Sequence, residues 1–556
     1  MRISNTTNGL KVQAIAGNYV VMLGIDLSKQ KCNGLLGFSI HRSDGDKDAF
    51  YLKAMKAFTE TDPGFPSGSL YSTEHHPIQS FQWADYSAKP GATYTYTITA
   101  LKGEPDNLTN YAETKVVVTT ESTASDKHEV YFNRGIAASQ EYVRRFGNLA
   151  PDKVPNNKAF EWLSRGLYEA LESFIRSCVP GVHKLRIAAY EFHCEELLEL
   201  IKSTIDTGVD IKIIYDYRQD KGPKHKNREI VDKYGLEDHC IERSEGKSYI
   251  SHNKFIVKLE GDSPVSVWTG GTNFSKSGIY GHSNVAHVFK DTYVANEFFE
   301  YWKILSQNVS RTKTRDEVGV INTLPVTPLS NGMKCVFSPR PNDSNSLALY
   351  EELSLAATNG LFMTFAFGIN DLFKKVFENS NGDLRFALLD KKTRGMKAAD
   401  RVIEEKKIDL LRFKPENIFA IGDLIHVTNK FDGWVKERLT GLNGHVRYIH
   451  NKFMLIDPLS SDPIIVTGSA NFSDASTFKN DENMVIIKGN TQIADIYLGE
   501  YMRLFSHHSF RESLKWRKPT DPPKPLKDNN ADEKWWEDYF GNTPRSSKRE
   551  YFSRIH

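Results

Sequence analysis

One short pattern occurs twice in this chain of 556 residues, and the two copies are about 200 residues apart. Each copy begins with H-x-K, continues as an apolar run and ends in a small-residue turn with Asn-Phe-Ser. Residues two apart in a strand point to the same face, so each copy presents an imidazole beside an ammonium group. Two copies with their turn amides supply a set of groups that suits attack on a phosphodiester. The residues concerned are His252, Lys254 and Asn273 in the first copy and His450, Lys452 and Asn471 in the second.

The duplicated pattern resembles the signature of the phospholipase D superfamily, H-x-K-x-x-x-x-D followed by G-[GS]-x-N, which is used twice per active site. The second copy contains every element of that signature, including Asp457 and Ser469. The first copy departs from it, because Leu259 stands at the aspartate position. The resemblance covers roughly residues 130 to 510. It implies a phosphodiesterase that works through a phosphohistidine intermediate and uses no metal ion or other cofactor.

The resemblance also implies different roles for the two histidines. Superfamily members carry an acidic residue downstream of the turn, and Glu482 occupies that place after the second copy. We expect Glu482 to hydrogen-bond His450, to raise the pKa of its imidazole and so to make it the proton donor.

In the first copy, alignment of Asn284 with Asn483 places Ser283 opposite the acidic residue. The prediction is therefore that His252 has no carboxylate partner, stays neutral and acts as the nucleophile. A similar asymmetry occurs in tyrosyl-DNA phosphodiesterases. The alternative is that the first copy is a structural relic.

The elements before each copy repeat in the same order: helix, strand, helix, strand. The expected ranges are 160–177, 185–192, 194–207 and 211–217 before the first copy, and 346–358, 361–367, 371–379 and 384–389 before the second. Alternating strands and helices predict a largely parallel α/β sheet in each half. We therefore expect two α/β lobes, 130–322 and 323–510, related by a pseudo-two-fold axis with both H-x-K strands at one cleft.

Residues 1–120 show short β-rich runs separated by turn residues, which is typical of a small all-β sandwich. The segment 89–96 resembles the corner of fibronectin type III domains, with Tyr94 at the corner position. A polar linker is expected at 121–129. The tail 511–556 is rich in proline and then in aromatic residues, and we expect Trp535 and Trp536 to dock on the body rather than to insert into a membrane.

Composition constrains location and partners. The formal net charge is only +2, so local patches rather than a global field would attract a polyanion. The five cysteines are unclustered, and neither a signal peptide nor an apolar segment of bilayer length is visible, which predicts a cytoplasmic protein. Basic stretches at Lys221–Arg228 and Lys391–Lys397 offer peripheral contacts with membrane or nucleic acid.

The substrate class stays open at this stage. Phospholipid hydrolysis is slightly favoured, because superfamily members with both motifs in one chain are often lipid-active. A nuclease or nucleic-acid end-processing enzyme is the alternative, favoured by the basic stretches. A third possibility is a non-catalytic binding protein, against which the intact second motif counts.

Overall fold

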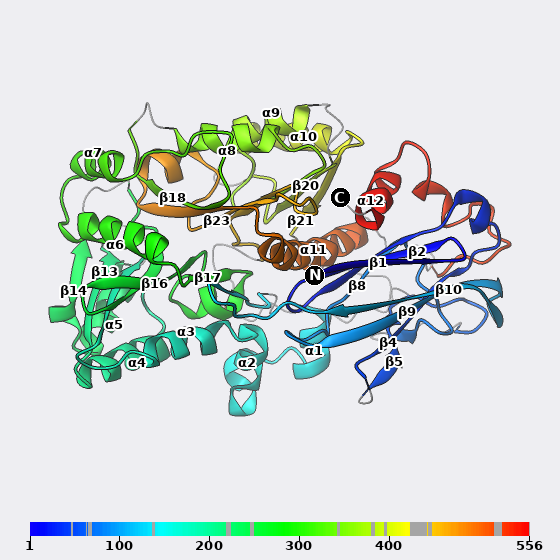
Figure 1. Cartoon of the computed structure of the whole chain (residues 1–556), viewed down its shortest axis with the longest axis horizontal. Coiled ribbons are helices and arrows are strands. Elements are labelled where there is room, and N and C mark those ends of the chain that lie inside the picture. The colour runs from blue at the N-terminus through cyan, green and yellow to red at the C-terminus, as the bar shows by residue number, and fades with distance from the viewer. Residues whose placement is uncertain are drawn as a thin grey trace.

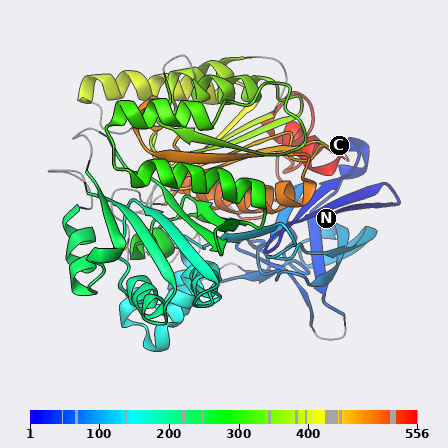
Figure 2. The same ribbon diagram turned by 60° about the vertical axis from the view of Figure 1, so that its left-hand side comes forward.

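The computed structural model describes the chain except residues 46–47, 63, 65–68, 136–138, 218–223, 245–248, 342–344, 380–383, 394–396, 423–441, 443–447, 516–524 and 555–556. Three parts are visible in Figure 1: two mixed α/β lobes and an N-terminal β region, with the long helix α11 between them. Figure 2 shows the same β region beside the two lobes after rotation. Within the described residues, no helix combines the length and the apolar character needed to cross a bilayer.

The N-terminal region consists of antiparallel sheets. One sheet has the order β1 (Arg2–Thr7), β2 (Leu10–Ala16), β3 (Val21–Asp26) and β8 (Gln82–Asp85). The other has the order β10 (Asn107–Thr119), β9 (Thr93–Glu104), β4 (Gly37–Ser43) and β5 (Ala49–Tyr51), and a small ladder joins β6 (Lys53–Ala54) to β7 (Tyr71–Ser72). Along the first half of β9, buried residues alternate with partly or fully exposed ones, so that part of the strand presents one face to a core. The Tyr94 hydroxyl accepts a hydrogen bond from the Lys89 backbone N–H at 3.0 Å, which ties the corner to its strand.

The first lobe is built on a seven-stranded sheet. Its order is β11 (His128–Phe132), β17 (Val285–Phe289), β16 (Ser263–Gly270), β15 (Lys254–Glu260), β12 (His183–Ala189), β13 (Asp210–Asp216) and β14 (Cys240–Arg243). Only β12, β13 and β14 pair in parallel, so the expectation of a largely parallel sheet is wrong. The hairpins that carry the H-x-K strand make the other half antiparallel. The sheet begins at His128, inside the segment expected to be a linker.

Helices cover this sheet on both faces. Those that contact its strands closely are α3 (Leu167–Arg176), α4 (Glu195–Asp206), α5 (Lys224–Lys233) and α6 (Thr292–Ser306). Helices α1 (Gln140–Phe146) and α2 (Lys158–Ser164) precede α3, and α7 (Arg311–Ile321) packs on α6 and on β18 (Gly332–Ser338) of the second lobe. The helix expected over 160–177 is in fact two helices. Arg165 and Gly166 adopt φ of 50° and 90°, the left-handed region that ends an α-helix, and this separates α2 from α3.

The second lobe repeats the first. Its sheet has the order β18 (Gly332–Ser338), β24 (Glu482–Lys488), β23 (Ile464–Gly468), β22 (Phe453–Ile456), β19 (Gly360–Phe365), β20 (Leu384–Leu389) and β21 (Asn417–Ile421). Its helices are α8 (Ser346–Leu355), α9 (Asp371–Glu378), α10 (Ala398–Arg412) and α11 (Thr491–Lys515). The matching strand orders support the predicted duplication.

The end of the chain returns to the body. Helix α11 continues past residue 510, so the predicted boundary between the second lobe and the tail falls inside a helix. Trp535 and Trp536 are buried in the core of the N-terminal region, and the Trp535 indole N–H donates to the Leu35 carbonyl at 2.8 Å. The following helix, α12 (Pro544–Ser553), packs on β3 and buries Phe552 completely. Docking of the aromatic tail is thus confirmed, whereas Pro519, Pro522 and Pro523 lie outside the described residues.

Candidate active site

The two lobes meet through a pair of short backbone ladders that run between them. The His252 backbone N–H donates to the Asp481 carbonyl at 2.9 Å, and the His450 N–H donates to the Ser283 carbonyl at 3.1 Å. Each histidine is thereby paired with the segment that leads into the last strand of the opposite lobe. The side chain that comes next in the sequence after each segment therefore lies beside the histidine of the other lobe.

A buried aspartate at the end of the second parallel strand supports each histidine from its own lobe. The Asp216 carboxylate accepts from the Ser251 N–H at 2.9 Å, and the Asp390 carboxylate accepts from the Tyr448 and Ile449 N–H groups at 2.8 and 3.1 Å. These bonds hold the chain that enters each H-x-K strand. Neither aspartate was predicted as a site residue, although both halves carry one at the end of a predicted strand.

Glu482 binds His252 and not His450, which corrects the expected pairing. Its Oε2 lies 2.8 Å from the His252 Nδ1 and also accepts from the Ser469 hydroxyl at 2.8 Å. Its Oε1 accepts from the Ser476 hydroxyl at 3.0 Å and from the Asn480 amide at 3.3 Å. Glu482 is fully buried. Because the backbone ladder pairs His252 with Asp481 of the second lobe, the neighbouring Glu482 reaches His252 and not the histidine of its own lobe.

The partner of His450 is Asn284, whose Oδ1 lies 2.9 Å from the imidazole Nδ1. The Asn284 amide donates to the Gly278 carbonyl at 2.7 Å, so its oxygen is the atom that faces His450. Asn284 therefore does for His450 what Glu482 does for His252, and the expected alignment of Asn284 with Asn483 is wrong by one residue. A constant spacing of 198 residues, the same from His252 to His450 as from Asn284 to Glu482, is the signal that indicates the correct register.

The lysines and the turn asparagines complete the arrangement. The Lys254 and Lys452 ammonium groups donate to the backbone carbonyls of His252 and His450 respectively. Among the described residues, the buried Oδ1 atoms of Asn273 and Asn471 have no hydrogen-bond partner. Six of the nine predicted site residues are linked by hydrogen bonds or by mutual charge across the lobe interface: His252, Lys254, His450, Lys452, Ser469 and Glu482.

Burial and mutual repulsion lower the pKa values of these imidazole and ammonium groups. Burial lowers the pKa of His252 to about 4, against the opposing effect of the Glu482 carboxylate, and lowers that of Lys254 to about 7. Burial, followed by the charges of Lys452 and the neighbouring imidazoles, lowers the pKa of His450 well below its ordinary value. The pKa of Lys452 is depressed in the same way, by burial and then by Lys254. A centre of this kind gains free energy when an anion enters it.

Two further side chains lie against the histidines. The His282 ring centroid is 4.5 Å from that of His450, and neither buried ring nitrogen of His282 has a hydrogen-bond partner within the part of the chain that the structure describes. The Tyr190 ring lies 4.9 Å from that of His252 and 5.0 Å from the Lys254 ammonium group. Neither residue has a counterpart of the same type in the second half, where Asn480 and Ala366 occupy the corresponding positions. The comparison of the two halves therefore does not indicate them.

Asp457 stands apart from this group. Its carboxylate accepts hydrogen bonds from the backbone N–H groups of Thr358, Asn359 and Gly360 at 2.7 to 3.2 Å, and from the Thr358 hydroxyl at 2.8 Å. These donors belong to the loop before β19 and to the first residue of that strand, at the end of β22 opposite Lys452. Asp457 therefore fixes a loop, and its carboxylate is not placed to contact a phosphate held by the two histidines.

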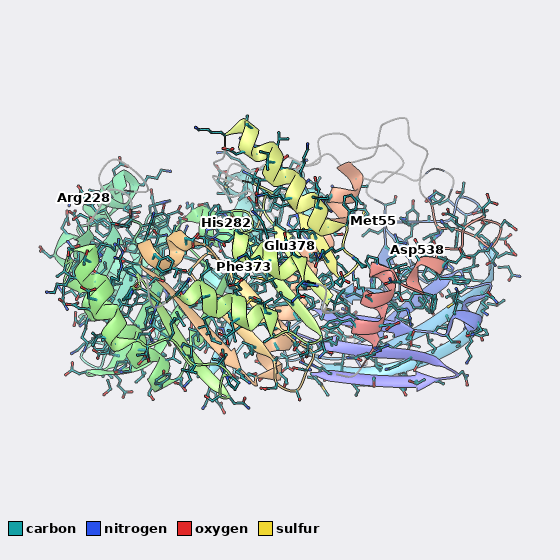
Figure 3. The ribbon with its side chains drawn as sticks, turned by 90° about the horizontal axis from the view of Figure 1, so that it is seen from above. Met55, Arg228, His282, Phe373, Glu378 and Asp538 are labelled. Atoms are coloured by element: carbon teal, nitrogen blue, oxygen red, sulfur yellow. The ribbon has the colours of Figure 1, made fainter. Side chains whose placement is uncertain are left out.

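The basic stretches are only partly within the described residues. Arg228 pairs with Asp232 and Glu242, and Lys392 pairs with Asp409. In Figure 3, Arg228 lies at the outer end of the first lobe, whereas His282 lies near the middle of the molecule. In the part of the chain that the structure describes, no group of three or more His, Cys, Asp or Glu residues is arranged to hold a metal ion.

Comparison with protein families gives one match. The model described as "Cardiolipin synthase, PLD-like domain" matches residues 171–304 and 380–505, one segment in each lobe. This match supports assignment of the two lobes to the phospholipase D superfamily, whose members act on phosphodiester bonds. A comparison with curated protein sequences finds no match.

Solved structures with distant similarity include three of interest. Phosphatidylserine synthase from Haemophilus influenzae Rd KW20 is 13% identical, with 62% of this chain and 85% of that chain covered and a TM-score of 0.45. Yeast tyrosyl-DNA phosphodiesterase is 13% identical, with 57% and 84% covered and a TM-score of 0.34. The phospholipase D family member Nuc from Salmonella typhimurium is 26% identical, with 24% and 84% covered and a TM-score of 0.21. None of these three reaches a TM-score of 0.5, so they say nothing about the substrate of this chain.

Proposed function

We propose that this protein is a phosphodiesterase that cleaves its substrate through a phosphohistidine on His252. The observation that carries the proposal is the hydrogen bonding of Glu482. Its carboxylate is surrounded by four donors, including the Ser469 hydroxyl and the His252 Nδ1. A carboxylate so placed accepts from Nδ1–H, which leaves the lone pair of the neutral imidazole on Nε2.

In the first step, the His252 Nε2 attacks phosphorus in line and forms the P–N bond. The P–O bond to the leaving group breaks, and the leaving oxygen takes a proton from the His450 Nε2. Attack makes the His252 ring cationic, and the Glu482 carboxylate at Nδ1 compensates that charge. Lys254 and Lys452 neutralise the charge on the non-bridging oxygens.

In the second step, water attacks the phosphohistidine and returns its proton to the His450 Nε2, while the P–N bond breaks. The Asn284 oxygen holds the Nδ1 proton of His450 throughout, so the same ring nitrogen serves as acid and then as base. A bound anion favours protonation of His450. Because burial lowers the pKa of this imidazole, its protonated form then gives up the proton readily to the leaving oxygen. The roles of the two histidines are those expected from the sequence, but the carboxylate supports the nucleophile and not the acid.

The test is the position of the covalent adduct. Protein exposed to bis(p-nitrophenyl) phosphate should carry one phosphoryl adduct on His252, located by mass spectrometry. His252→Ala should carry none, and His450→Ala should accumulate it. His75→Ala, which removes a solvent-exposed imidazole of the N-terminal region, serves as the control and should behave as the wild type. An adduct on His450, or one that survives in His252→Ala, would overturn the assignment.

The same chemistry serves a phospholipid or a nucleotide strand, because the scissile group is identical. Transfer to an alcohol in place of water uses the same intermediate. Product analysis in the presence of added glycerol separates the two outcomes, and we propose that water is the acceptor.

A further inference from the structure

His282 is a buried histidine of the candidate active site that takes no part in the two steps above. It comes directly before Ser283, which the backbone ladder joins to the second lobe, and its ring is in contact with that of His450. Figure 3 shows His282 near the middle of the molecule. The residue is 6% exposed, and among the described residues neither ring nitrogen has a hydrogen-bond partner. A buried polar group in this state costs free energy, which a bound molecule with polar atoms offsets.

The counterpart of His282 in the second lobe, 198 residues later, is Asn480, and both ends of its side-chain amide are bonded. The Asn480 Oδ1 accepts from the Ile250 backbone N–H at 3.2 Å, and the amide nitrogen donates to the Glu482 carboxylate at 3.3 Å. Asn480 thus helps to hold the residue that fixes the opposite histidine. His282 does not do the same for Asn284, because its ring nitrogens make no bond within the described part of the chain. The imidazole is therefore free to bind a ligand.

Two charged side chains act on His282. Burial lowers the pKa of its imidazole to about 4, against the opposing effect of the Glu191 carboxylate and with a further lowering by Lys452. The ring is therefore neutral near pH 7, with one N–H donor and one acceptor nitrogen. A neutral imidazole of this kind accepts a hydrogen bond from a water molecule.

The second step of the mechanism needs a water molecule held beside His450. One O–H group of that water gives its proton to the His450 Nε2, while a lone pair points at phosphorus. A buried water ordinarily makes about three hydrogen bonds, so its second O–H group also needs an acceptor. The ring of His282, whose centroid lies 4.5 Å from that of His450, supplies an acceptor nitrogen at this place.

We infer that His282 binds the hydrolytic water and directs it at the phosphohistidine on His252. The inference rests on the proposed function, because only that mechanism supplies a phosphohistidine. The water donates one O–H group to His282 and the other to His450. As the O–P bond forms and the P–N bond breaks, the proton facing His450 passes to its Nε2, and the other proton stays on the product oxygen.

Two variants separate the steps: His282→Ala removes the ring, and His282→Phe keeps its packing without its nitrogens. With bis(p-nitrophenyl) phosphate, both should release the burst of p-nitrophenol within about 3-fold of the wild-type rate. Steady-state turnover should fall by about 10- to 100-fold, because the water loses a hydrogen bond and its orientation. The adduct on His252 should then accumulate, as mass spectrometry would detect. His282→Gln, which keeps an acceptor, should recover part of the turnover, and His75→Ala is the control at an exposed histidine.

Added methanol provides a second readout. Methanol has a single O–H group, which goes to His450, so methanolysis of the phosphohistidine does not use His282. The ratio of methyl p-nitrophenyl phosphate to p-nitrophenyl phosphate should therefore rise about 10-fold in His282→Ala, in line with the loss of one hydrogen bond to water alone. A merely structural role for His282 would lower both products alike.

Equal losses of burst rate and turnover in His282→Phe would overturn the inference, and so would an unchanged product ratio. Wild-type turnover in both ring variants would also overturn it. Failure of the proposed function has a different signature, because the wild-type protein would then carry no adduct on His252, whatever the variants of His282 do.

Discussion

Replacing Glu482 by glutamine should slow formation of the phosphohistidine while leaving the fold intact, because the change is isosteric and removes one charge. The His252 Nδ1 then loses a charge-assisted hydrogen bond at the moment when its ring becomes cationic. The introduced side-chain amide also meets the Asn480 amide, which lies 3.3 Å from the native carboxylate, as a second donor. A loss of about 2 to 4 kcal/mol in the transition state corresponds to a rate about 30 to 1,000 times lower.

The assay is the burst of p-nitrophenol from bis(p-nitrophenyl) phosphate, which reports the first step alone. Glu482 raises the pKa of His252 from the lower value that burial would impose, so the variant's imidazole should have a pKa below about 4. Its activity should accordingly persist to lower pH than that of the wild type, although at a lower rate. Glu74→Gln, at a half-exposed carboxylate of the N-terminal region, is the control.

Two results would refute this reasoning. A burst rate within about 3-fold of the wild-type rate would mean that the carboxylate does not act on the nucleophile. A variant impaired only toward substrates with poor leaving groups would mean that Glu482 acts on the proton donor, as the sequence first indicated.

Asn284→Ala should free the His450 ring and lower the rate about 10-fold for substrates with alkyl leaving groups. Release of p-nitrophenol should change little, because this leaving group needs no proton, and equal losses for both kinds of substrate would contradict the assignment. Turnover should survive EDTA, and a loss restored by a divalent ion would exclude the lysine-based mechanism. Asp457→Ala should lower the free energy of unfolding by about 1 to 2 kcal/mol, as loss of a helix cap does, with kcat of the folded protein unchanged. Because the pKa values of His252 and His282 are lowered from 6.5 to about 4 by burial, the unfolded chain takes up protons first on acidification. Thermal unfolding should show stability falling from pH 6.5 toward pH 4, less so with phosphate bound, and a flat profile would contradict the predicted shifts.

The sequence predicted the duplication and the order of elements because both follow from periodicity and motif spacing, which are local. It did not predict the exchange of partners between the lobes, because the spacing of Glu482 from His450 carries no information about which lobe it faces. The register of the first copy was displaced by one residue because Asn284 and Asn483 are chemically alike. Asp457 looked catalytic because it belongs to the motif, and only the loop that it holds, before β19, reveals its role.

The mixed sheets and the helix break have similar explanations. The sequence of a short apolar strand does not indicate whether the strand pairs in parallel or antiparallel. The hairpins that contain β15 and β22 make their pairings antiparallel. The break between α2 and α3 depends on the left-handed conformation of Arg165. Arginine rarely adopts this conformation, so the sequence does not indicate a helix end there.

On the proposed mechanism, catalysis requires both lobes, because the backbone ladders pair each histidine with a segment of the opposite lobe. Neither lobe alone contains a histidine together with the side chain that fixes its ring, since His252 needs Glu482 and His450 needs Asn284. Separately expressed halves of the chain should each be inert, and mixing them should restore turnover only to the extent that they dock. On the proposed mechanism, any ligand, mutation or denaturant that separates the lobes should therefore abolish both steps at once.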